Sequence, residues 1–345
     1  MREEKRISTA TDTTRQIGTA GAAGAAVVAQ TAHIAQAAPV AQAIQTAQQA
    51  DTGHRFGSVA LIGRPNAGKS TLLNHIVGEK VAIVTDKPQT TRTRIMGILT
   101  RPDWQMVVYD APGIHEPKDK LGRNMMHTAI GALEWVDVVY YITDAGSVFG
   151  KGEEQIMRIL QNVTKPVFLL LNKVDLMSRE EILPIIAAWH EKREFAQIFP
   201  ISALRGDNVE ELLAASAACF PEGPRCYEED EMTDQPERVI AAEMIREKAI
   251  LASRQEVPYA VAVYIEKMEQ RRADLTDIYG VIVVEQQGQK GILIGKQGST
   301  LKRIGTEARR DIEALLGIRV NLQLWVQVRE DWRNKDRHLK EYGLS

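Results

Sequence analysis

The sequence predicts an α/β domain with a mostly parallel sheet, followed by a smaller α+β domain. Three observations predict this organisation. Between Phe56 and Phe220, short apolar runs alternate with helical patterns, as they do in βαβ units. The first run, residues 56–62, leads into a glycine-rich stretch, and a helical pattern opens directly after it. Beyond an acidic, proline-containing stretch, residues 228–236, helical and extended patterns follow in a different order.

The first fifty-three residues differ in composition from the rest. Ala, Gln and Thr dominate residues 17–50, which hold almost no aromatic or large branched side chain. Such a segment cannot bury enough apolar surface to offset the entropy lost on ordering. Residues 1–53 are therefore predicted to form a disordered tail. An organellar transit peptide is an alternative, because basic residues between Arg2 and Arg15 precede the alanine-rich run.

The stretch GRPNAGKS predicts a phosphate-binding loop between the first strand and the first helix. Its glycines let the backbone turn tightly, so that successive N–H groups point at the β-phosphate. The Lys69 ammonium would reach the β- and γ-phosphate oxygens, and the Ser70 hydroxyl would ligate Mg²⁺. The residues predicted to bind the nucleotide here are Gly63, Arg64, Pro65, Asn66, Ala67, Gly68, Lys69, Ser70 and Thr71.

Further strands of this domain are predicted from apolar runs at residues 95–100, 104–109, 137–143, 167–171 and 197–201. The run Trp135–Asp144 is the predicted central strand, with its aromatic side chains in the core. Asp110-Ala-Pro-Gly113 ends the strand 104–109. There Asp110 would hold Mg²⁺ through water, and the Gly113 N–H would meet the γ-phosphate. These motifs fall at the carboxyl ends of strands, where open α/β sheets bind ligands.

A second motif predicts that the base of the nucleotide is guanine. Asn172-Lys173-Val174-Asp175 ends the apolar strand 167–171. The Asp175 carboxylate can accept both the N1–H and the exocyclic amine of guanine, which adenine does not offer, so GTP is predicted over ATP. Ser202-Ala203-Leu204 follows the last strand and suits a backbone contact to the guanine oxygen.

The C-terminal part has the order helix, strand, strand, GxxG, helix, strand, which resembles a type II KH domain. The predicted elements are a helix at 237–251, strands at 259–265 and 278–285, a helix at 299–316 and a strand at 319–328. Residues predicted to bind RNA are Gly295, Lys296, Gln297, Gly298, Lys302 and Arg303. The glycines would let a single-stranded RNA backbone approach, and the helix N-terminus with Lys296 would favour phosphate. Arg309 and Arg310 either join this surface or form a solvated helix face.

From Phe56 onward the chain resembles the Era family of translation-factor-like GTPases, within the TrmE-Era-EngA group. The resemblance implies hydrolysis of GTP to GDP and phosphate, with Mg²⁺ as cofactor. Pro88-Gln-Thr-Thr-Arg92 matches the family's effector loop, where Thr91 would close on Mg²⁺ and the γ-phosphate. The implied catalytic residues are Lys69, Thr91, Asp110 and Gly113, and the implied Mg²⁺ ligands are Ser70, Thr91 and Asp110.

Two positions bear on the hydrolysis step. Where Ras-type GTPases place a glutamine after Asp-x-x-Gly, this chain has Ile114, which has no polar group to orient water, so slow intrinsic hydrolysis is predicted. In the resembled group a P-loop asparagine helps to hold a K⁺ ion, and Asn66 stands at that position. The alternative for Asn66 is a loop amide that binds its own backbone.

The resemblance also implies partners and a place in the cell. These are the single-stranded 3′ end of small-subunit ribosomal RNA, a 30S-type particle, and a role in ribosome assembly. The formal net charge is −2, so an RNA-binding surface has to be a local basic patch. A cytoplasmic protein, monomeric and in peripheral contact with the inner face of the membrane, is expected.

The predicted organisation is a tail at 1–53, the GTPase domain at 54–222, a linker at 223–236 and the KH domain at 237–345. Two alternatives remain open at this point. In one, the chain is an RNA-binding protein whose GTP site is structural rather than a switch. In the other, it is a different ribosome- or tRNA-associated GTPase of the same group.

Overall fold

The computed structural model describes residues 53–253 and 257–345. The predicted tail, up to residue 52, and its transit-peptide alternative lie outside the described residues. Both sheets described below belong to one structural unit, Thr52–Ser345. No helix in the described ranges is long and apolar enough to cross a membrane.

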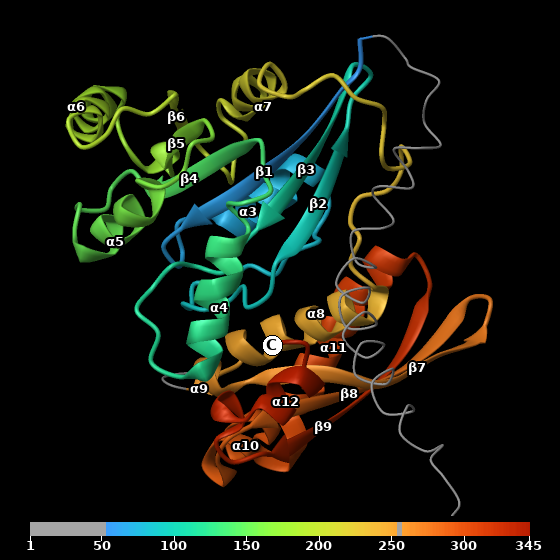
Figure 1. Ribbon diagram of the computed structural model, residues 1–345. Coiled ribbons are helices and arrows are strands. Elements are labelled where there is room, and N and C mark those ends of the chain that lie inside the picture. The colour runs from blue at the N-terminus through green and yellow to red at the C-terminus, as the bar shows by residue number, and fades with distance from the viewer. Residues whose placement is uncertain (1–52, 254–256) are drawn as a thin grey trace, which may run out of the picture. The chain divides into compact units, whose positions relative to one another are not determined.

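The N-terminal part is built on a six-stranded sheet with the strand order β2-β3-β1-β4-β5-β6. Its strands are β1 (Arg55–Gly63), β2 (Ile95–Thr100), β3 (Trp104–Asp110), β4 (Val138–Asp144), β5 (Val167–Asn172) and β6 (Gln197–Ile201). Every neighbouring pair is parallel except β2 with β3 (Figure 1). The mostly parallel sheet predicted from the alternating pattern is therefore confirmed.

Helices cover both faces of this sheet. They are α3 (Lys69–Val77), α4 (Lys120–Gly131), α5 (Lys151–Leu160), the short η1 (Val174–Leu176), α6 (Arg179–His190) and α7 (Val209–Ala217). On one face, Leu72 of α3 and Leu212 of α7 join a core with the sheet. On the other face, Ala129 of α4, Ile156 of α5 and Trp189 of α6 form a second core. Burial of both faces explains why the strands read as continuous apolar runs.

One aromatic side chain that was predicted to lie in the core is exposed. β4 begins at Val138, and the Trp135 side chain before it is 79% exposed, so the prediction was wrong for this residue. The Asp137 carboxylate accepts hydrogen bonds from the Ser58 N–H and hydroxyl at 2.8 and 2.9 Å, which ties the chain to β1 just before β4 starts. Tyr140 and Tyr141, inside the strand, are fully buried as predicted.

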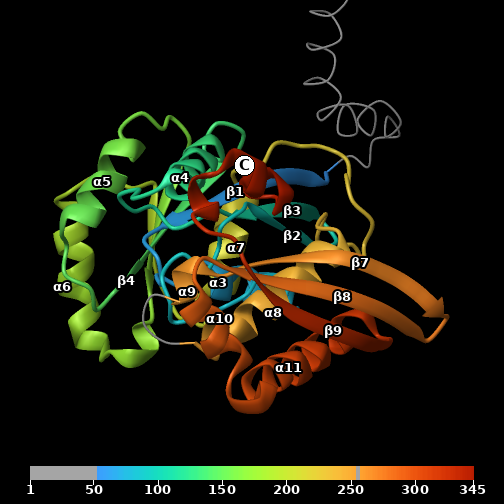
Figure 2. The ribbon, with the colours of Figure 1, turned by 90° about the horizontal axis from the view of Figure 1, so that it is seen from below.

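The C-terminal part has a three-stranded sheet with the order β7-β8-β9. Its elements are α8 (Glu237–Leu251), α9 (Val257–Ala260), β7 (Ala262–Arg272), β8 (Leu275–Val284), α10 (Gln287–Ile294), η2 (Lys296–Gly298), α11 (Ser299–Leu316), β9 (Arg319–Val328), η3 (Trp332–Asn334) and α12 (Asp336–Glu341). β7 and β8 are antiparallel, and β8 and β9 are parallel. Figure 2 shows α8 and α11 together against this sheet, with which they share a core.

Two elements of this part differ from the sequence prediction. The strand predicted to start at Tyr259 starts at Ala262, because residues 257–260 form the short helix α9. Helix α10 was not predicted at all. It opens where the Gln289 side-chain oxygen accepts hydrogen bonds from the backbone N–H groups of Glu285 and Gln286 at 2.9 and 3.0 Å. Only Gln289 and Leu293 of α10 are buried, so its apolar pattern is short.

Candidate functional site

The glycine-rich loop lies between β1 and α3, at the carboxyl edge of the sheet. Gly68 has φ of 105°, and a Cβ there would meet Asn172 Nδ2 at 2.0 Å, so only glycine fits. A Cβ at Gly113 would meet the Pro65 backbone nitrogen at 2.8 Å, which explains glycine at that position too. The close approach of these segments brings the loop, Asn172 and Gly113 together around one site.

Lys69 folds back over the loop. Its ammonium donates to the Arg64 carbonyl oxygen at 3.0 Å and to that of Gly63 at 3.5 Å. Burial lowers the pKa of Lys69, and the nearby Asp110 carboxylate opposes that effect. A buried ammonium with only carbonyl partners is well suited to exchange them for phosphate oxygens.

A pocket of about 410 Å³ opens in front of the loop. Its lining residues are Pro65, Asn66, Gly68, Lys69, Ser70, Thr71, Ile83, Val84, Thr85, Asp86, Gln89, Thr90, Thr91, Gly113 and Lys173. The pocket therefore joins the predicted phosphate loop to the segment before β2. We call residues 84–92 the effector loop.

Three oxygen-bearing side chains meet at one side of this pocket. The Ser70 hydroxyl donates to Asp110 Oδ2 at 2.5 Å, and Thr91 Oγ1 lies 2.8 Å from Ser70 Oγ and 3.2 Å from the same carboxylate oxygen. Burial raises the pKa of Asp110, and its other oxygen, Oδ1, is buried without a hydrogen-bond partner among the described residues.

This cluster fits Mg²⁺, which takes a few hard oxygen ligands and keeps several waters. Ser70, Thr91 and Asp110 would hold the ion directly or through water. A Mg²⁺ ion held there would neutralise negative charge on the phosphates of the nucleotide. The Thr90 hydroxyl is occupied differently, since it donates to the Lys87 carbonyl oxygen at 2.6 Å. Of the two adjacent threonines, the structure thus turns Thr91 toward the cluster.

The predicted guanine-reading segments follow β5 and β6, two neighbouring strands. Asn172 braces the site: its Nδ2 donates to the Ala67 carbonyl at 2.7 Å, and its Oδ1 accepts from the Ala203 N–H at 2.9 Å. Both side-chain groups of Asn172 are thereby used within the protein. Lys173 pairs with Asp144 at 2.7 Å.

The remaining residues predicted to bind the base lie on the same edge. The Asp175 carboxylate is 3.8 Å from Arg205 Nε. The Ser202 hydroxyl is buried and accepts from the Arg205 N–H at 3.1 Å, while Leu204 is 76% exposed. Asp175 and the segment 202–204 do not line the pocket in front of the phosphate loop. The structure places them beside it.

The two positions that bear on hydrolysis have partners that sequence patterns did not indicate. Ile114 is 1% exposed and packs in the core, so its side chain does not face the pocket. His115 Nδ1 is 2.7 Å from the Gly113 carbonyl, and its Nε2 is 2.9 Å from Gln89 Nε2. A neutral ring that donates from Nδ1 and accepts at Nε2 satisfies both contacts. Asn66 Nδ2 donates to the Asp86 carbonyl at 2.7 Å, which ties the phosphate loop to the effector loop.

A groove of about 370 Å³ lies between α11 and β9. Its lining residues are Gly298, Leu301, Lys302, Gly305, Thr306, Arg309, Leu322 and Leu324. Lys302 lines it as predicted by position, and Arg309 joins it, whereas Arg303 and residues 295–297 are outside its lining. Gly295 has φ of 73°, and a Cβ there would meet Thr300 Oγ1 at 2.2 Å, so the sharp turn before α11 requires glycine.

Comparisons with known proteins match both parts of the chain. A family model described as 50S ribosome-binding GTPase matches residues 58–173, and a KH domain model matches residues 256–333. GTPase Era of Lacticaseibacillus paracasei is 49% identical over 292 residues, which cover 85% of this chain and 97% of that protein.

Two solved structures are similar over almost their whole length. One is Era in complex with MgGDPNP and nucleotides 1506–1542 of 16S ribosomal RNA, with a TM-score of 0.81 and 40% identity over 85% of this chain and 99% of that one. The other is an Aquifex aeolicus Era variant bound to GDP·AlF4⁻, with a TM-score of 0.81 and 40% identity over 84% and 99%. The chain therefore belongs to the Era family of GTPases.

Proposed function

We propose that this GTPase binds small-subunit ribosomal RNA near its 3′ end and assists assembly of the small ribosomal subunit. The observation that carries the proposal is the groove between α11 and β9, in a chain that is similar over 85% of its length to an Era structure holding a 16S ribosomal RNA segment. The groove belongs to the segment matched by the KH domain model.

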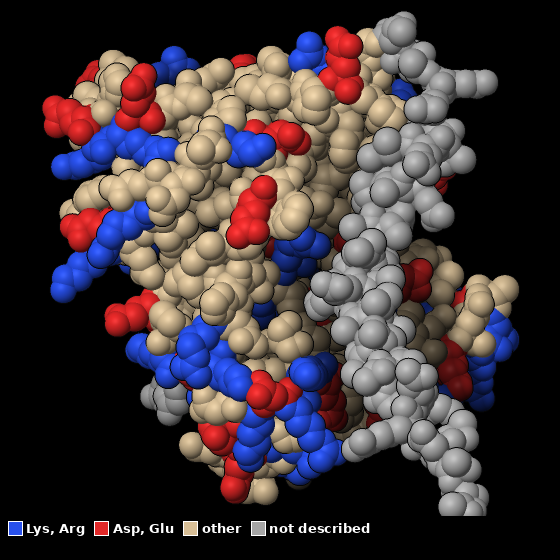
Figure 3. All heavy atoms as spheres, viewed as in Figure 1, with Lys and Arg blue, Asp and Glu red and all other residues tan. Residues whose placement is uncertain are grey.

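The chemistry of the groove favours single-stranded RNA. Leu322 and Leu324 supply an apolar floor on which unstacked bases can lie, and Lys302 and Arg309 stand on the helix that forms its wall. Figure 3 shows basic side chains gathered over the lower part of one face, around α10 and α12. A local basic surface of this kind supports RNA binding despite the formal net charge of −2.

For the chemical step, we propose roles that follow the geometry of the pocket. The catalytic residues are Lys69, Thr91, Asp110 and Gly113, and Mg²⁺ is held by Ser70, Thr91 and Asp110. The base is read by Asp175, with Ser202, Ala203 and Leu204 beside it, while Asn172 and Lys173 support this end of the site. The hydrogen bonds among Ser70, Thr91 and Asp110 support the assignment of the metal ligands.

We propose K⁺ as a second cofactor near Asn66, whose side chain bridges the phosphate loop and the effector loop. The support is its position in the loop and the absence of a polar side chain at Ile114. Hydrolysis is expected to be faster in KCl than in NaCl at equal ionic strength, and Asn66→Ala should remove the difference. Equal rates in the two salts would exclude this role.

Further partners and places are proposed on the family resemblance. They are a 30S-type ribosomal particle, a monomeric state, a cytoplasmic location and peripheral contact with the inner face of the membrane. We also propose the division of the chain into a tail at 1–53, a GTPase domain at 54–222, a linker at 223–236 and a KH domain at 237–345. The acidic composition of the linker supports that boundary.

The proposed function is tested by GTP hydrolysis in KCl with and without a short RNA from the 3′ end of small-subunit ribosomal RNA. Stimulation by the RNA, lost in Gly295→Ala, is expected. The second candidate function is an RNA-binding protein with a structural GTP site. It predicts tight RNA binding and a rate of GTP hydrolysis that does not change when the RNA is added. An unrelated RNA of equal length that stimulates equally would contradict the proposed target.

A further inference from the structure

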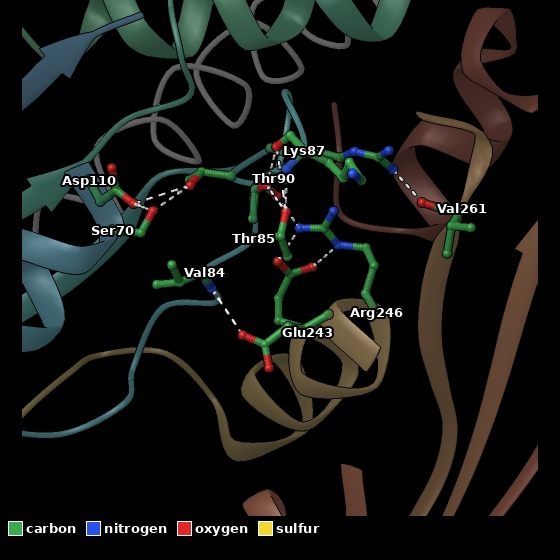
Figure 4. A network of polar contacts seen from close by, with 12 residues as sticks. Ser70, Val84, Thr85, Lys87, Thr90, Asp110, Glu243, Arg246 and Val261 are labelled. Atoms are coloured by element: carbon green, nitrogen blue, oxygen red, sulfur yellow. Dashed lines mark hydrogen bonds and ion pairs between the residues drawn. The ribbon is translucent and has the colours of Figure 1, made fainter. Parts of the chain in front are cut away.

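The effector loop is held by side chains of the C-terminal domain. Arg246 of α8 donates through a guanidinium N–H to the Thr90 carbonyl oxygen, and Glu243 holds Arg246 with two hydrogen bonds at 2.7 and 2.5 Å (Figure 4). At the start of the loop, the Val84 N–H donates to the Glu247 carboxylate at 3.0 Å. Arg246 and Glu247 are 2% and 3% exposed, so these contacts are shielded from water.

A second contact runs in the opposite direction. The Arg92 guanidinium, at the end of the effector loop, enters the C-terminal domain and donates to the carbonyl oxygens of Val261, Tyr259 and Pro258 at 2.6, 3.0 and 3.4 Å. It also lies 5.6 Å from the ring centre of Trp332, which is a cation–π distance. These backbone carbonyls come from the short α9 and from Val261, which lies between α9 and β7.

Arg92 keeps its charge in this position. Burial and the neighbouring Arg246 lower the pKa of Arg92 to about 9, which is still above neutral pH. A buried cation needs strong acceptors, because an unpaired one would cost several kcal/mol. The convergent carbonyls therefore bind Arg92 tightly only while the two domains remain docked.

Thr91 lies between these two anchors. Thr90 and Arg92 flank it in the chain, and both contact the C-terminal domain, while the Thr91 hydroxyl lies among Ser70 and Asp110 at the Mg²⁺ cluster. The loop is also closed on itself, since the hydroxyl oxygens of Thr85 and Thr90 are 2.6 Å apart. Rotation of the docked domain would pull on both backbone neighbours of the metal-binding threonine.

We propose that the C-terminal domain is a clamp that positions Thr91 for Mg²⁺ and the γ-phosphate, with Arg246 and Arg92 as the positioning residues. With the C-terminal domain docked, the nucleotide pocket should prefer GTP over GDP, because only GTP has the γ-phosphate that Thr91 would contact. The inference rests on the GTPase activity of the family and needs no RNA, so it stands or falls apart from the proposed RNA target. Coupling between sites is reciprocal, so GTP must favour docking by the same factor.

Ordinary domain packing is the competing explanation, and another part of the same interface offers a matched control. The Lys120–Asp336 ion pair, at 2.5 Å, joins α4 to α12 without touching the effector loop. Asp336 is 66% exposed, so its substitution should leave the fold intact. A clamp predicts different effects for Arg246 and Asp336, whereas general packing predicts similar ones.

The test measures the affinity of the full chain for fluorescent GDPNP and GDP at saturating Mg²⁺. Arg246→Ala should weaken GDPNP binding about tenfold and leave GDP binding within about twofold, as coupling energies of this kind allow. Arg92→Ala should act in the same direction, with partial rescue in Arg92→Lys, which keeps the charge but loses the planar fork. Asp336→Asn should leave both affinities unchanged.

A second readout does not depend on nucleotide affinity. Hydrogen exchange of the backbone amides at 84–92 should be slow in the GDPNP complex of the wild type and faster in Arg246→Ala. Should Arg246→Ala fail to fold, Glu243→Gln keeps the side-chain volume and removes the charge that orients Arg246, and it should show the same selective loss. The clamp is refuted if these variants keep the wild-type GDPNP-to-GDP ratio, or if Asp336→Asn lowers that ratio as much as they do.

Discussion

Asp110 has two opposed effects on the protein. Its carboxylate is fully buried, burial raises its pKa, and one of its oxygens lacks a hydrogen-bond partner among the described residues. A group whose charged form is disfavoured in the folded state lowers the free energy of unfolding at neutral pH. A bound divalent cation would compensate the buried charge of Asp110. The residue therefore lowers the stability of the empty protein and favours binding of the cation.

Asp110→Asn is therefore expected to stabilise the nucleotide-free protein while it weakens Mg²⁺-dependent GTP binding. The Tm of nucleotide-free Asp110→Asn should be higher than that of the wild type, because the amide carries no charge that burial disfavours. Thermal melts with and without MgGTP check it. Asp103→Asn, on an exposed turn, should change neither melt, and a lower Tm for Asp110→Asn in the absence of nucleotide would contradict the account.

Alanine substitutions at Gly68 and Gly78 would distinguish the effect of backbone strain from that of a steric clash. Both have positive φ, 105° and 84°, but a Cβ at Gly68 would meet Asn172 at 2.0 Å, whereas at Gly78 nothing lies within 4 Å. Gly78→Ala should cost about 1 kcal/mol in the free energy of unfolding and keep GTP affinity. Gly68→Ala should abolish GTP binding. The comparison is made by denaturant melts and nucleotide titration, and equal effects of the two would refute the steric explanation.

Helix α11 presents two adjacent basic residues, and only one of them lines the groove. Lys302 lines the groove together with Arg309, which lies about two turns further along the same helix, whereas Arg303 does not line it. The sequence pattern could not show which basic residues line the groove, and it favoured Lys302 and Arg303. Helical spacing of seven residues places 302 and 309 on one face, but the position of β9 decides which face is the groove.

Lys302→Ala and Arg309→Ala are each expected to weaken binding of a 3′-end RNA, with a salt slope reduced by about 0.7 for one lost phosphate contact to a single strand. Arg303→Ala should change the affinity much less. Titrations over a range of KCl concentrations measure both quantities. If Arg303→Ala weakens binding as much as Lys302→Ala, the RNA does not follow the groove between α11 and β9.

The accuracy of the sequence-based predictions depended on how local each feature is. Residues 63–70 form a motif whose loop geometry needs only its own glycines and the flanking strand and helix, and α11 was predicted with its observed bounds. Helix α10 was missed because it buries few apolar residues. Trp135 was placed in the core because the apolar pattern alone does not show that the strand begins only at Val138.

The link between the two domains could not be predicted. Arg92 and the carbonyl of Val261 are 169 positions apart, and Arg246 meets Thr90 across 156 positions. A backbone carbonyl has no sequence signature, so neither acceptor is recognisable in the chain. The sequence indicated two modules, and the structure indicates how the state of one can act on the other.

The central claim is that the nucleotide state and the RNA-binding domain form one switch. It is tested most directly by the affinity of the full chain for a short RNA from the 3′ end of small-subunit ribosomal RNA, measured with GDPNP and with GDP bound. The account predicts affinities that differ by at least about fivefold, the lower bound of typical coupling between sites, with the difference abolished in Arg246→Ala. Equal affinities in the two nucleotide states of the wild type would contradict it.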